Sequence, residues 1–195
     1  MDLKGRHIIL GSASPRRKEL LRGLGIEFEV DTRNTFEENF KELGTLREIP
    51  SIMSRGKSHG FHRPLEDGEI LITADTVVLC DGMVMGKPSG REEAAAMLRK
   101  LSGRKHEVIT SVTLRSASRE DTFSDTALVS FADLTDEEID YYIERYRPFD
   151  KAGAYGVQEW IGYIGIDSIT GSFYTIVGFP VFMVYRHLKD FLQDK

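Results

Sequence analysis

The segment from Ser12 to Arg17 reads Ser-Ala-Ser-Pro-Arg-Arg and is the first candidate for chemistry. It follows a short apolar run and precedes a helical pattern, in which Ser14 suits the N-cap and Pro15 the first helical position. Free N–H groups at a helix N-terminus attract anions, and Arg16 and Arg17 add forked donors for phosphate oxygens. Two cations placed against the helix dipole need a compensating anion, so we favour a phosphate-binding turn over a solvated surface helix.

Asp75 is the second candidate, because it stands inside an apolar segment. Residues 69–80 are mostly apolar, and Thr73, Asp75 and Thr76 interrupt them near the middle. A carboxylate in such a setting is rarely buried without a partner. It can hold a metal, act as a general base or form a structural ion pair, and the residue pattern leaves these alternatives open.

Three further residues carry little signal by themselves. Lys57 and Lys87 read as ordinary surface lysines, and Glu37 lies in an acidic loop where it would be solvated. The five histidines are scattered, so neither a histidine metal site nor a Ser-His-Asp arrangement follows. A site that binds a hard cation through oxygen ligands is the remaining metal option.

The elements that must position these residues follow from apolar periodicity and from turn signals. Strands are expected at 7–10, 28–30, 69–80, 107–115 and 122–131, with shorter strand-like pieces at 154–157, 162–168 and 174–177. Helices are expected at 14–25, around 48–62, at 91–101, from 135 to about 145 and at 180–192. Ser89 with Glu92, and Thr135 with Glu138, have the spacing of capping boxes. The sequence therefore predicts an α/β or α+β chain, in a single domain split by a cleft.

Composition narrows the class of protein. The 195 residues are 41% hydrophobic and 29% charged, which predicts a globular fold. No apolar run reaches the roughly 18 to 20 residues of a membrane span, and no secretory core is present, so we expect no membrane association and a cytoplasmic location. The net charge of -5 argues against nucleic acid as a partner. The lone Cys80 is expected to be a small buried hydrophobe.

Five segments, taken together, resemble the Maf family of nucleoside triphosphate pyrophosphatases, which are related in fold to the inosine triphosphatases. They are Ser12–Arg17, Ala74-Asp75-Thr76-Val77, Gly86-Lys87-Pro88, Leu101-Ser-Gly-Arg and Lys151-Ala-Gly-Ala-Tyr-Gly-Val-Gln158. The matches run in order from Leu10 to Pro180, nearly the whole chain. The resemblance implies one Maf-like domain over residues 1–195, with an elongated mixed sheet flanked by helices and two lobes around a deep central cleft.

The resemblance also implies roles for individual residues. Asp75 would be the catalytic proton acceptor, with Lys57 and Lys87 as further catalytic residues on the triphosphate. The substrate-binding residues would be Ser12, Ser14, Arg16, Arg17, Thr76 and Gln158. Glu37 and Asp75 would hold a divalent cation, Mg²⁺ or Mn²⁺, which suits carboxylate oxygens. Water would attack the α-phosphorus and expel pyrophosphate. The chain departs from the family pattern at Phe36, where a second acidic residue is expected before Glu37.

Three functions compete under this resemblance. They are hydrolysis of dTTP and UTP, with CTP or modified pyrimidine nucleotides as further substrates, hydrolysis of 7-methylguanosine triphosphate, and nucleotide binding that regulates septum formation without catalysis. Asp75 with the two lysines argues against the last. Gln158 favours the first, because a neutral amide complements uracil or thymine, whereas cationic 7-methylguanine favours a carboxylate. We expect house-cleaning of nucleotide pools, and the sequence leaves open a homodimer and a link to cell-division arrest.

Overall fold

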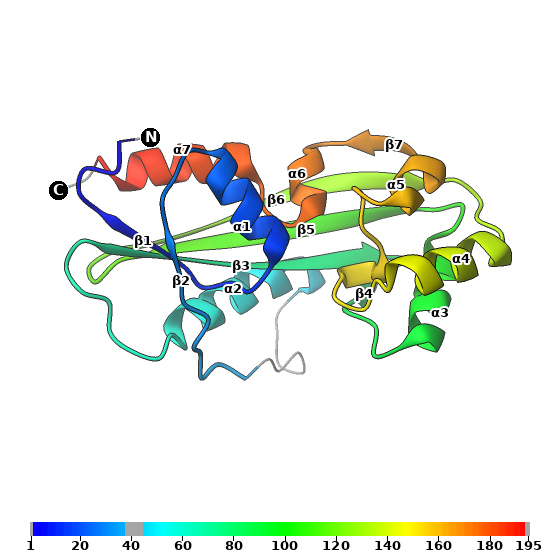
Figure 1. The fold of residues 1–195 in the computed structure, drawn as a ribbon, viewed down its shortest axis with the longest axis horizontal. Coiled ribbons are helices and arrows are strands. Elements are labelled where there is room, and N and C mark those ends of the chain that lie inside the picture. Colours follow the sequence, from blue (N-terminus) through cyan, green and yellow to red (C-terminus); the bar gives the residue numbers. More distant parts are fainter. Residues whose placement is uncertain (1, 38–44, 194–195) are drawn as a thin grey trace. The chain divides into compact units, whose positions relative to one another are not determined.

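The computed structural model describes residues 2–37 and 45–193 (Figure 1). In these residues seven strands form a mixed sheet in the order β2-β1-β3-β5-β6-β7, with β4 paired to β3. The strands are β1 (His7–Leu10), β2 (Glu29–Val30), β3 (Glu69–Cys80), β4 (Met83–Met85), β5 (Lys105–Arg115), β6 (Glu120–Phe131) and β7 (Ile166–Thr170). Strand β1 is parallel to β2 and β3, whereas β4 and β7 are antiparallel to their partners.

Helices flank this sheet, which confirms the predicted mixed α/β architecture. The helices are α1 (Pro15–Gly23), α2 (Ile49–His59), α3 (Arg91–Leu101), α4 (Asp136–Tyr146), α5 (Trp160–Gly165), α6 (Phe173–Val177) and α7 (Val181–Phe191), with short 3-10 turns η1 (Leu46–Glu48) and η2 (Ala152–Ala154). No helix in the described part of the chain is long and apolar enough to cross a bilayer.

The chain forms two compact units. Unit 1 contains the described residues of 1–75, 110–125 and 178–195, and unit 2 contains 76–109 and 126–177. Strands β3, β5 and β6 each begin in one unit and end in the other. Asp75 is the last residue of unit 1 along β3, and Thr76 is the first of unit 2.

Strand alternation divides the side chains of unit 1 between two faces of its strands. On β3, Ile70 and Ile72 join a buried cluster that includes Leu21 of α1 and Val184 of α7. Leu71, between them in sequence, belongs to a different cluster. Figure 1 shows α1 and α7 on one side of these strands and α2 on the other. Side chains of β3 that lie on the same face of the strand as Leu71 therefore face α2.

Unit 2 is organised around α3 and α4. Ala94, Leu98, Ile139 and Ile143 are buried on the two helices. At the start of α4 the predicted capping box is confirmed, because the Thr135 hydroxyl accepts from the N–H of Glu138 while the Glu138 carboxylate accepts from the N–H of Thr135. The capping box satisfies N–H groups that the first turn of a helix leaves without an intrahelical acceptor.

The capping box predicted at Ser89 has a different form. Gly90 occupies the N-cap position of α3, and both the N–H and the hydroxyl of Ser89 donate to the carboxylate of Glu93, at 2.7 and 2.6 Å. The expected partner, Glu92, is one residue too early, because the helix begins at Arg91 and not at Gly90.

Two of the short strands predicted near the C-terminus are wrong. At 154–157, Ala154 has a φ of +60°, which turns the backbone out of an extended path. At 174–177 the chain forms helix α6, and Gly171 and Gly178, with φ of +107° and +102°, bound that segment. Aromatic and β-branched residues favour strands there, but the glycine turns close the segment into a single helical turn.

The third short piece is partly correct. Helix α5 occupies the first half of the predicted strand 162–168, and β7 begins only at Ile166. From there β7 pairs with β6, with Thr170 opposite Leu128.

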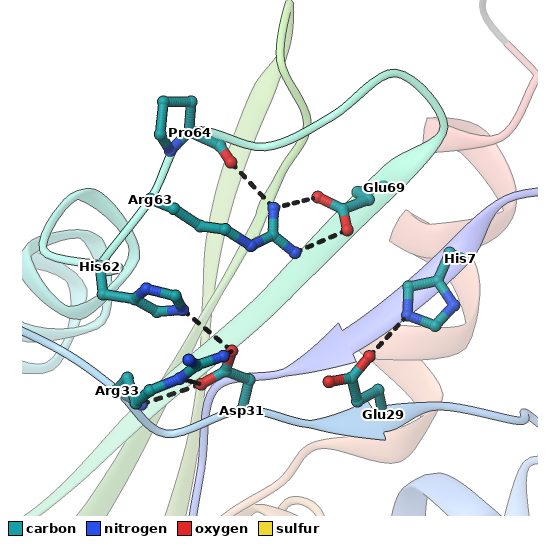
Figure 2. Close-up of polar contacts among 8 residues, drawn as sticks. All are labelled: His7, Glu29, Asp31, Arg33, His62, Arg63, Pro64 and Glu69. Carbon is teal, nitrogen blue, oxygen red and sulfur yellow. Dashed lines mark hydrogen bonds and ion pairs between the residues drawn. The ribbon is translucent and has the colours of Figure 1, made fainter.

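Ion pairs in unit 1 lie along two segments, the one that follows β2 and the one that leads into β3 (Figure 2). Asp31 with His62 joins the two segments, and Arg63 with Glu69 lies within the second. Arg63 donates from its two terminal nitrogens to both carboxylate oxygens of Glu69, each at 2.7 Å. These bonds favour the charged carboxylate and lower the pKa of Glu69 to about 2. Asp31 is buried, and its carboxylate lies 2.6 Å from Arg33 and 3.0 Å from the imidazole of His62. The hydrogen bond from Arg33 likewise lowers the pKa of Asp31.

These pairs predict a specific loss of stability in acid. The folded pKa of Glu69 lies below its unfolded value of 4.5, so its contribution is present above about pH 4.5 and is lost as the pH falls towards 2. We expect Glu69→Gln to lower the free energy of unfolding by about 1 to 3 kcal/mol at pH 7 and by about half as much or less at pH 3. Urea unfolding at both pH values measures this. The matched control is Asp140→Asn, which breaks the exposed Arg91–Asp140 pair and should change stability by less than about 0.5 kcal/mol.

Candidate functional site

The turn before α1 has the capped geometry that its sequence predicts. The Ser14 hydroxyl accepts from the N–H of Arg17 at 3.4 Å, and Pro15 begins the helix. The Ser12 hydroxyl accepts from the N–H of Ser14 and from Nη1 of Arg17, both at 3.3 Å. Arg16, which is partly buried, lies in the same first turn. Serine hydroxyls and two guanidinium groups therefore gather at the positive end of a helix dipole.

Arg17 is also bound to the backbone of two other segments. Its Nε donates to the carbonyl of Gly178 at 2.9 Å, and its Nη1 donates to the carbonyl of Ala74 at 2.8 Å. Burial lowers the pKa of the Arg17 guanidinium, while the negative charge of Asp75 acts in the opposite direction. Arg17 thus fixes α1 to the residue that precedes Asp75, whatever part it takes in binding phosphate.

Asp75 lies on the face of β3 that is turned towards α2. It has the parity of Leu71 and Thr73, and its Oδ1 accepts from Nζ of Lys57 at 2.7 Å. The exposed fractions of the two side chains are 15% for Asp75 and 25% for Lys57. Two charges that are partly shielded from water attract each other more strongly than a solvated pair, and the contact orients the carboxylate.

Buried hydroxyl groups hold α2 against the strands in the position that the ion pair between Lys57 and Asp75 requires. Thr73 donates to the carbonyl of Ser54 at 2.7 Å, and the hydroxyls of Ser54 and Thr113 lie 2.9 Å apart. One turn along the helix, Arg115 donates through Nε to the hydroxyl of Ser58 at 2.9 Å. Ser54, Ser58, Thr73 and Thr113 are all almost fully buried. The buried side of α2 therefore carries two serines beside the apolar Ile49, Pro50 and Met53, and Lys57 lies between these serines in sequence.

Glu37, the second carboxylate expected at the metal site, is exposed. Among residues 2–37 and 45–193, no group of three or more His, Cys, Asp and Glu side chains is placed to hold a metal ion. Mg²⁺ commonly takes one or two carboxylates together with substrate phosphates. Asp75 is the described carboxylate at this place that could contribute to such a ligand set.

In unit 2, two of the motif segments contact each other through their backbones. The N–H of Gly153 donates to the carbonyl of Gly86 at 3.1 Å, which places the Gly-Lys-Pro segment beside the segment that begins at Lys151. Gly153 has a φ of +68°, and a Cβ there would meet the side chain of Val78 on β3 at 3.1 Å. Glycine is needed at this position for both reasons. The side chain of Lys87 itself is exposed.

Gln158 lies on the wall of a pocket of about 490 Å³ in unit 2. The pocket is also lined by the aromatic side chains of Tyr163 and Phe173 and by the polar residues Asp167 and Ser168. The Tyr163 hydroxyl donates to the backbone carbonyl of Gln158 at 3.3 Å. An amide beside aromatic rings is a suitable setting for a flat heterocycle with hydrogen-bonding edges.

A buried network fixes the backbone on either side of Gln158. The Tyr142 hydroxyl donates to the Glu159 carboxylate and accepts from the N–H of Gly156 at 2.9 Å. Nζ of Lys151 lies 3.1 Å from the other Glu159 oxygen. Burial and the carboxylate together raise the pKa of Tyr142, so the phenol stays protonated and keeps donating.

His106 supports the same segment from β5. Its Nε2 lies 2.8 Å from the hydroxyl of Tyr155, and its ring packs edge-on against Phe131. Burial lowers the pKa of His106 to about 4, so the imidazole is neutral at physiological pH.

The sequence matches the family described as Maf-like protein over residues 7–191. The chain belongs to the Maf family. Three Maf relatives named dTTP/UTP pyrophosphatase come from Porphyromonas gingivalis (strain ATCC BAA-308 / W83), Bacteroides thetaiotaomicron and Christiangramia forsetii. They are 51%, 50% and 43% identical to this chain, over 97%, 96% and 98% of its length and 96%, 97% and 97% of theirs. A solved HAM1 protein from Coxiella burnetii is 16% identical, with a TM-score of 0.44, over 66% of this chain and 74% of that one.

This Maf chain brings together part of the residue set expected from its sequence. Ser12, Ser14 and Arg17 contact one another, and Lys57 contacts Asp75, all within unit 1. Thr76, Lys87 and Gln158 belong to unit 2, where Gln158 lines the pocket with Tyr163 and Phe173. The supporting residues Ser54, Thr73 and Thr113 and the network around Tyr142 were missed. Polar residues within the patterns of α2, β3 and β5 are the sequence signal that would have identified Ser54, Thr73 and Thr113.

Arg17 yields a prediction that separates anchoring from phosphate binding. Arg17→Ala leaves the Ala74 and Gly178 carbonyls without this donor in a partly buried place, so we expect unfolding to become easier by about 1 to 3 kcal/mol. Arg17→Lys keeps the positive charge but cannot donate to two divergent carbonyls. Its free energy of unfolding should therefore lie between those of wild type and Arg17→Ala. Thermal and urea unfolding without nucleotide measure this. Equal stability of wild type and Arg17→Ala would contradict the anchoring role.

Proposed function

We propose that this Maf protein hydrolyses dTTP and UTP to the corresponding monophosphates and pyrophosphate, with a divalent cation as cofactor. The observation that carries the proposal is the Asp75 carboxylate, held at 2.7 Å by Lys57 in a partly desolvated position. The names of relatives that match nearly the whole chain support the choice of substrate.

In this proposal Asp75 accepts the proton of the attacking water. The oxygen of that water forms a bond to the α-phosphorus, and the bond from the α-phosphorus to the bridging oxygen of the pyrophosphate group breaks. The positive charge of Lys57 favours the charged form of Asp75, which is the form that can accept a proton. Lys57 also fixes the direction of the Asp75 oxygens. Positioning of the water and the carboxylate supplies much of the rate enhancement.

The triphosphate is held by positive groups from several segments. The capped turn with Ser12, Ser14 and Arg16 offers hydroxyl, N–H and guanidinium donors at a helix N-terminus. Arg17 adds charge from a guanidinium that is already fixed by two carbonyls. We assign Lys87 to the leaving pyrophosphate, because it is an exposed cation on a segment fixed by the Gly86–Gly153 contact.

The proposed cation, Mg²⁺ or Mn²⁺, is assigned to Asp75, with Glu37 as a second carboxylate. Such a cation offsets the charge that develops on the phosphate oxygens. Asp75 is suited to this because its carboxylate stays charged beside Lys57. Phe36 stands where a second acidic neighbour of Glu37 was expected, so the triphosphate itself is assigned the larger share of the oxygen ligands.

Base selection is assigned to Gln158, with Thr76 and Arg16 as the other members of the pattern that the family resemblance implies. The amide can donate to O4 and accept from N3–H of uracil or thymine. Tyr163 and Phe173, on the same pocket, offer aromatic surface to the ring. A carboxylate would be expected at this position for 7-methylguanosine triphosphate, so we place that substrate second.

The first test removes the charge of Asp75. Asp75→Asn keeps the side-chain shape, so we expect kcat for dTTP to fall at least about a hundredfold, the scale of general-base and metal effects. Release of pyrophosphate, and not of phosphate, is measured with Mn²⁺ and with Mg²⁺. The matched control is Asp67→Asn, an exposed carboxylate of the same unit, which should keep full activity. Normal turnover by a folded Asp75→Asn protein would overturn the proposed mechanism.

The second test concerns the base. Gln158→Glu replaces a donor with an acceptor, which opposes O4 of the pyrimidine and costs on the order of 1 to 3 kcal/mol. We expect kcat/KM for dTTP and UTP to fall about ten- to a hundredfold, and that for 7-methylguanosine triphosphate to fall less or to rise. An equal loss on every triphosphate would remove Gln158 from base selection.

A further inference from the structure

Phe36 lies against Gly56 of α2 and Gly60, the C-cap of that helix, which leave room for its side chain. A Cβ built on Gly56 would lie 2.3 Å from Cε2 and Cζ of Phe36, far inside van der Waals contact. A Cβ built on Gly60, one helical turn later, would lie 2.6 Å from the Cβ of Phe36. The aromatic residue and the two glycines are therefore complementary in shape, and a larger residue at position 56 would displace the ring.

The backbone around Phe36 is bonded to the same helical turn. The N–H of Thr35 donates to the carbonyl of Gly60 at 2.8 Å, and the side-chain amide of Asn34 donates to the carbonyl of Lys57. Asn34 Oδ1 in turn accepts from the N–H of Phe36 at 2.7 Å. We call residues 31–37 the strap. Its contacts converge on the part of α2 that contains Lys57.

The other end of the strap is fixed by the ion pairs of Figure 2. There Asp31 lies between Arg33 and His62, and the N–H of His62 donates to the carbonyl of Arg33 at 3.3 Å. His62 lies three residues beyond the end of α2. The strap is thus tied to α2 at Lys57 and Gly60, and to the chain beyond the helix at His62.

Lys57 needs this support because its own helix is locally weak. Glycine is the poorest helix former after proline, and Gly56 lies inside α2 next to the lysine, three residues before the helix ends at His59. Buried hydroxyls fix α2 on the side of the strands, through Ser54 and Ser58. Phe36 and Asn34 hold the turn through Gly56 and the Lys57 carbonyl, so removal of the ring would loosen the ion pair with Asp75.

We propose that Phe36 is a positioning residue for the hydrolysis, which acts through Lys57. Seated on Gly56, it fixes the helical turn whose lysine orients the Asp75 carboxylate. This inference rests on the proposed function, since it assigns Phe36 an effect on that reaction. The aromatic residue thus has a role of its own where an acidic one was expected.

The test compares Phe36→Ala and Phe36→Leu with wild type, using dTTP and pyrophosphate release. A misplaced catalytic group costs rate, so we expect Phe36→Ala to lower kcat at least about tenfold and to change KM less than about threefold. Phe36→Leu, which refills part of the space, should recover part of the lost kcat. A kcat for Phe36→Ala within about twofold of wild type would overturn the inference and leave the proposed function standing.

The matched control is Phe28→Ala. Phe28 is a partly buried phenylalanine of the same unit that packs against the core beside α1 and α7. Its removal should lower the thermal midpoint but leave kcat within about twofold, measured well below the unfolding temperature. A fall in kcat as large as that of Phe36→Ala would mean that any loss of core packing has this effect, and would overturn the specific role.

A double-mutant cycle tests the contact itself without any substrate. Gly56→Ala should lower the thermal midpoint in the wild-type background, because its Cβ meets the Phe36 ring. In the Phe36→Ala background the same substitution should leave the midpoint unchanged or raise it, because alanine is the better helix former. Equal effects in both backgrounds would show that the two residues are not coupled and would overturn the inference. An inactive wild type with a coupled cycle would overturn the proposed function, and with it the positioning role of Phe36 in the reaction.

Discussion

The carboxylate of Asp75 must stay charged inside a strand whose neighbours are buried, and the arrangement of unit 1 meets that requirement. Lys57 supplies the opposite charge at 2.7 Å. To bring Lys57 there, α2 must lie close over the strands, and two of its five buried residues are serines that bond to them. Ser54 and Ser58 meet Thr113 and Arg115 for this purpose. Without the two serines, the Thr113 hydroxyl would lose its partner on α2 and Nε of Arg115 would lose its acceptor.

The parts that the sequence predicts well are those fixed by local chemistry. Ser14 and Pro15 determine the start of α1, and the apolar segment 69–80 becomes β3 at those residues. Asp75 stands out for the same reason, as a charge among apolar neighbours. Lys57 does not, because its role depends on a contact across 18 residues that no local pattern encodes. Only the resemblance to a family pointed to it.

The errors in the last third of the chain have a common physical cause. Aromatic and β-branched residues at 154–157 and 174–177 favour strands, but nearby residues with positive φ close these segments into turns and short helices. The supports of Gln158 were missed for a different reason. Tyr142 of α4 and Glu159 of the loop beyond η2 come into contact only in the folded chain, and neither residue type predicts its partner from the sequence. A buried phenol becomes informative only once its surroundings are known.

The boundary between the units falls between Asp75 and Thr76, so the proposed site residues are divided between two parts of the chain. Asp75, Lys57 and the capped turn belong to unit 1, whereas Thr76 and Gln158 belong to unit 2. Exchange of residues 76–109 and 126–177 between two members of the family would carry over Thr76 and Gln158 and leave the ion pair untouched. Under the proposed function, the nucleobase that is accepted can change through substitutions in these two segments while the Asp75–Lys57 pair is kept, provided that Lys87, which lies in 76–109, is kept as well.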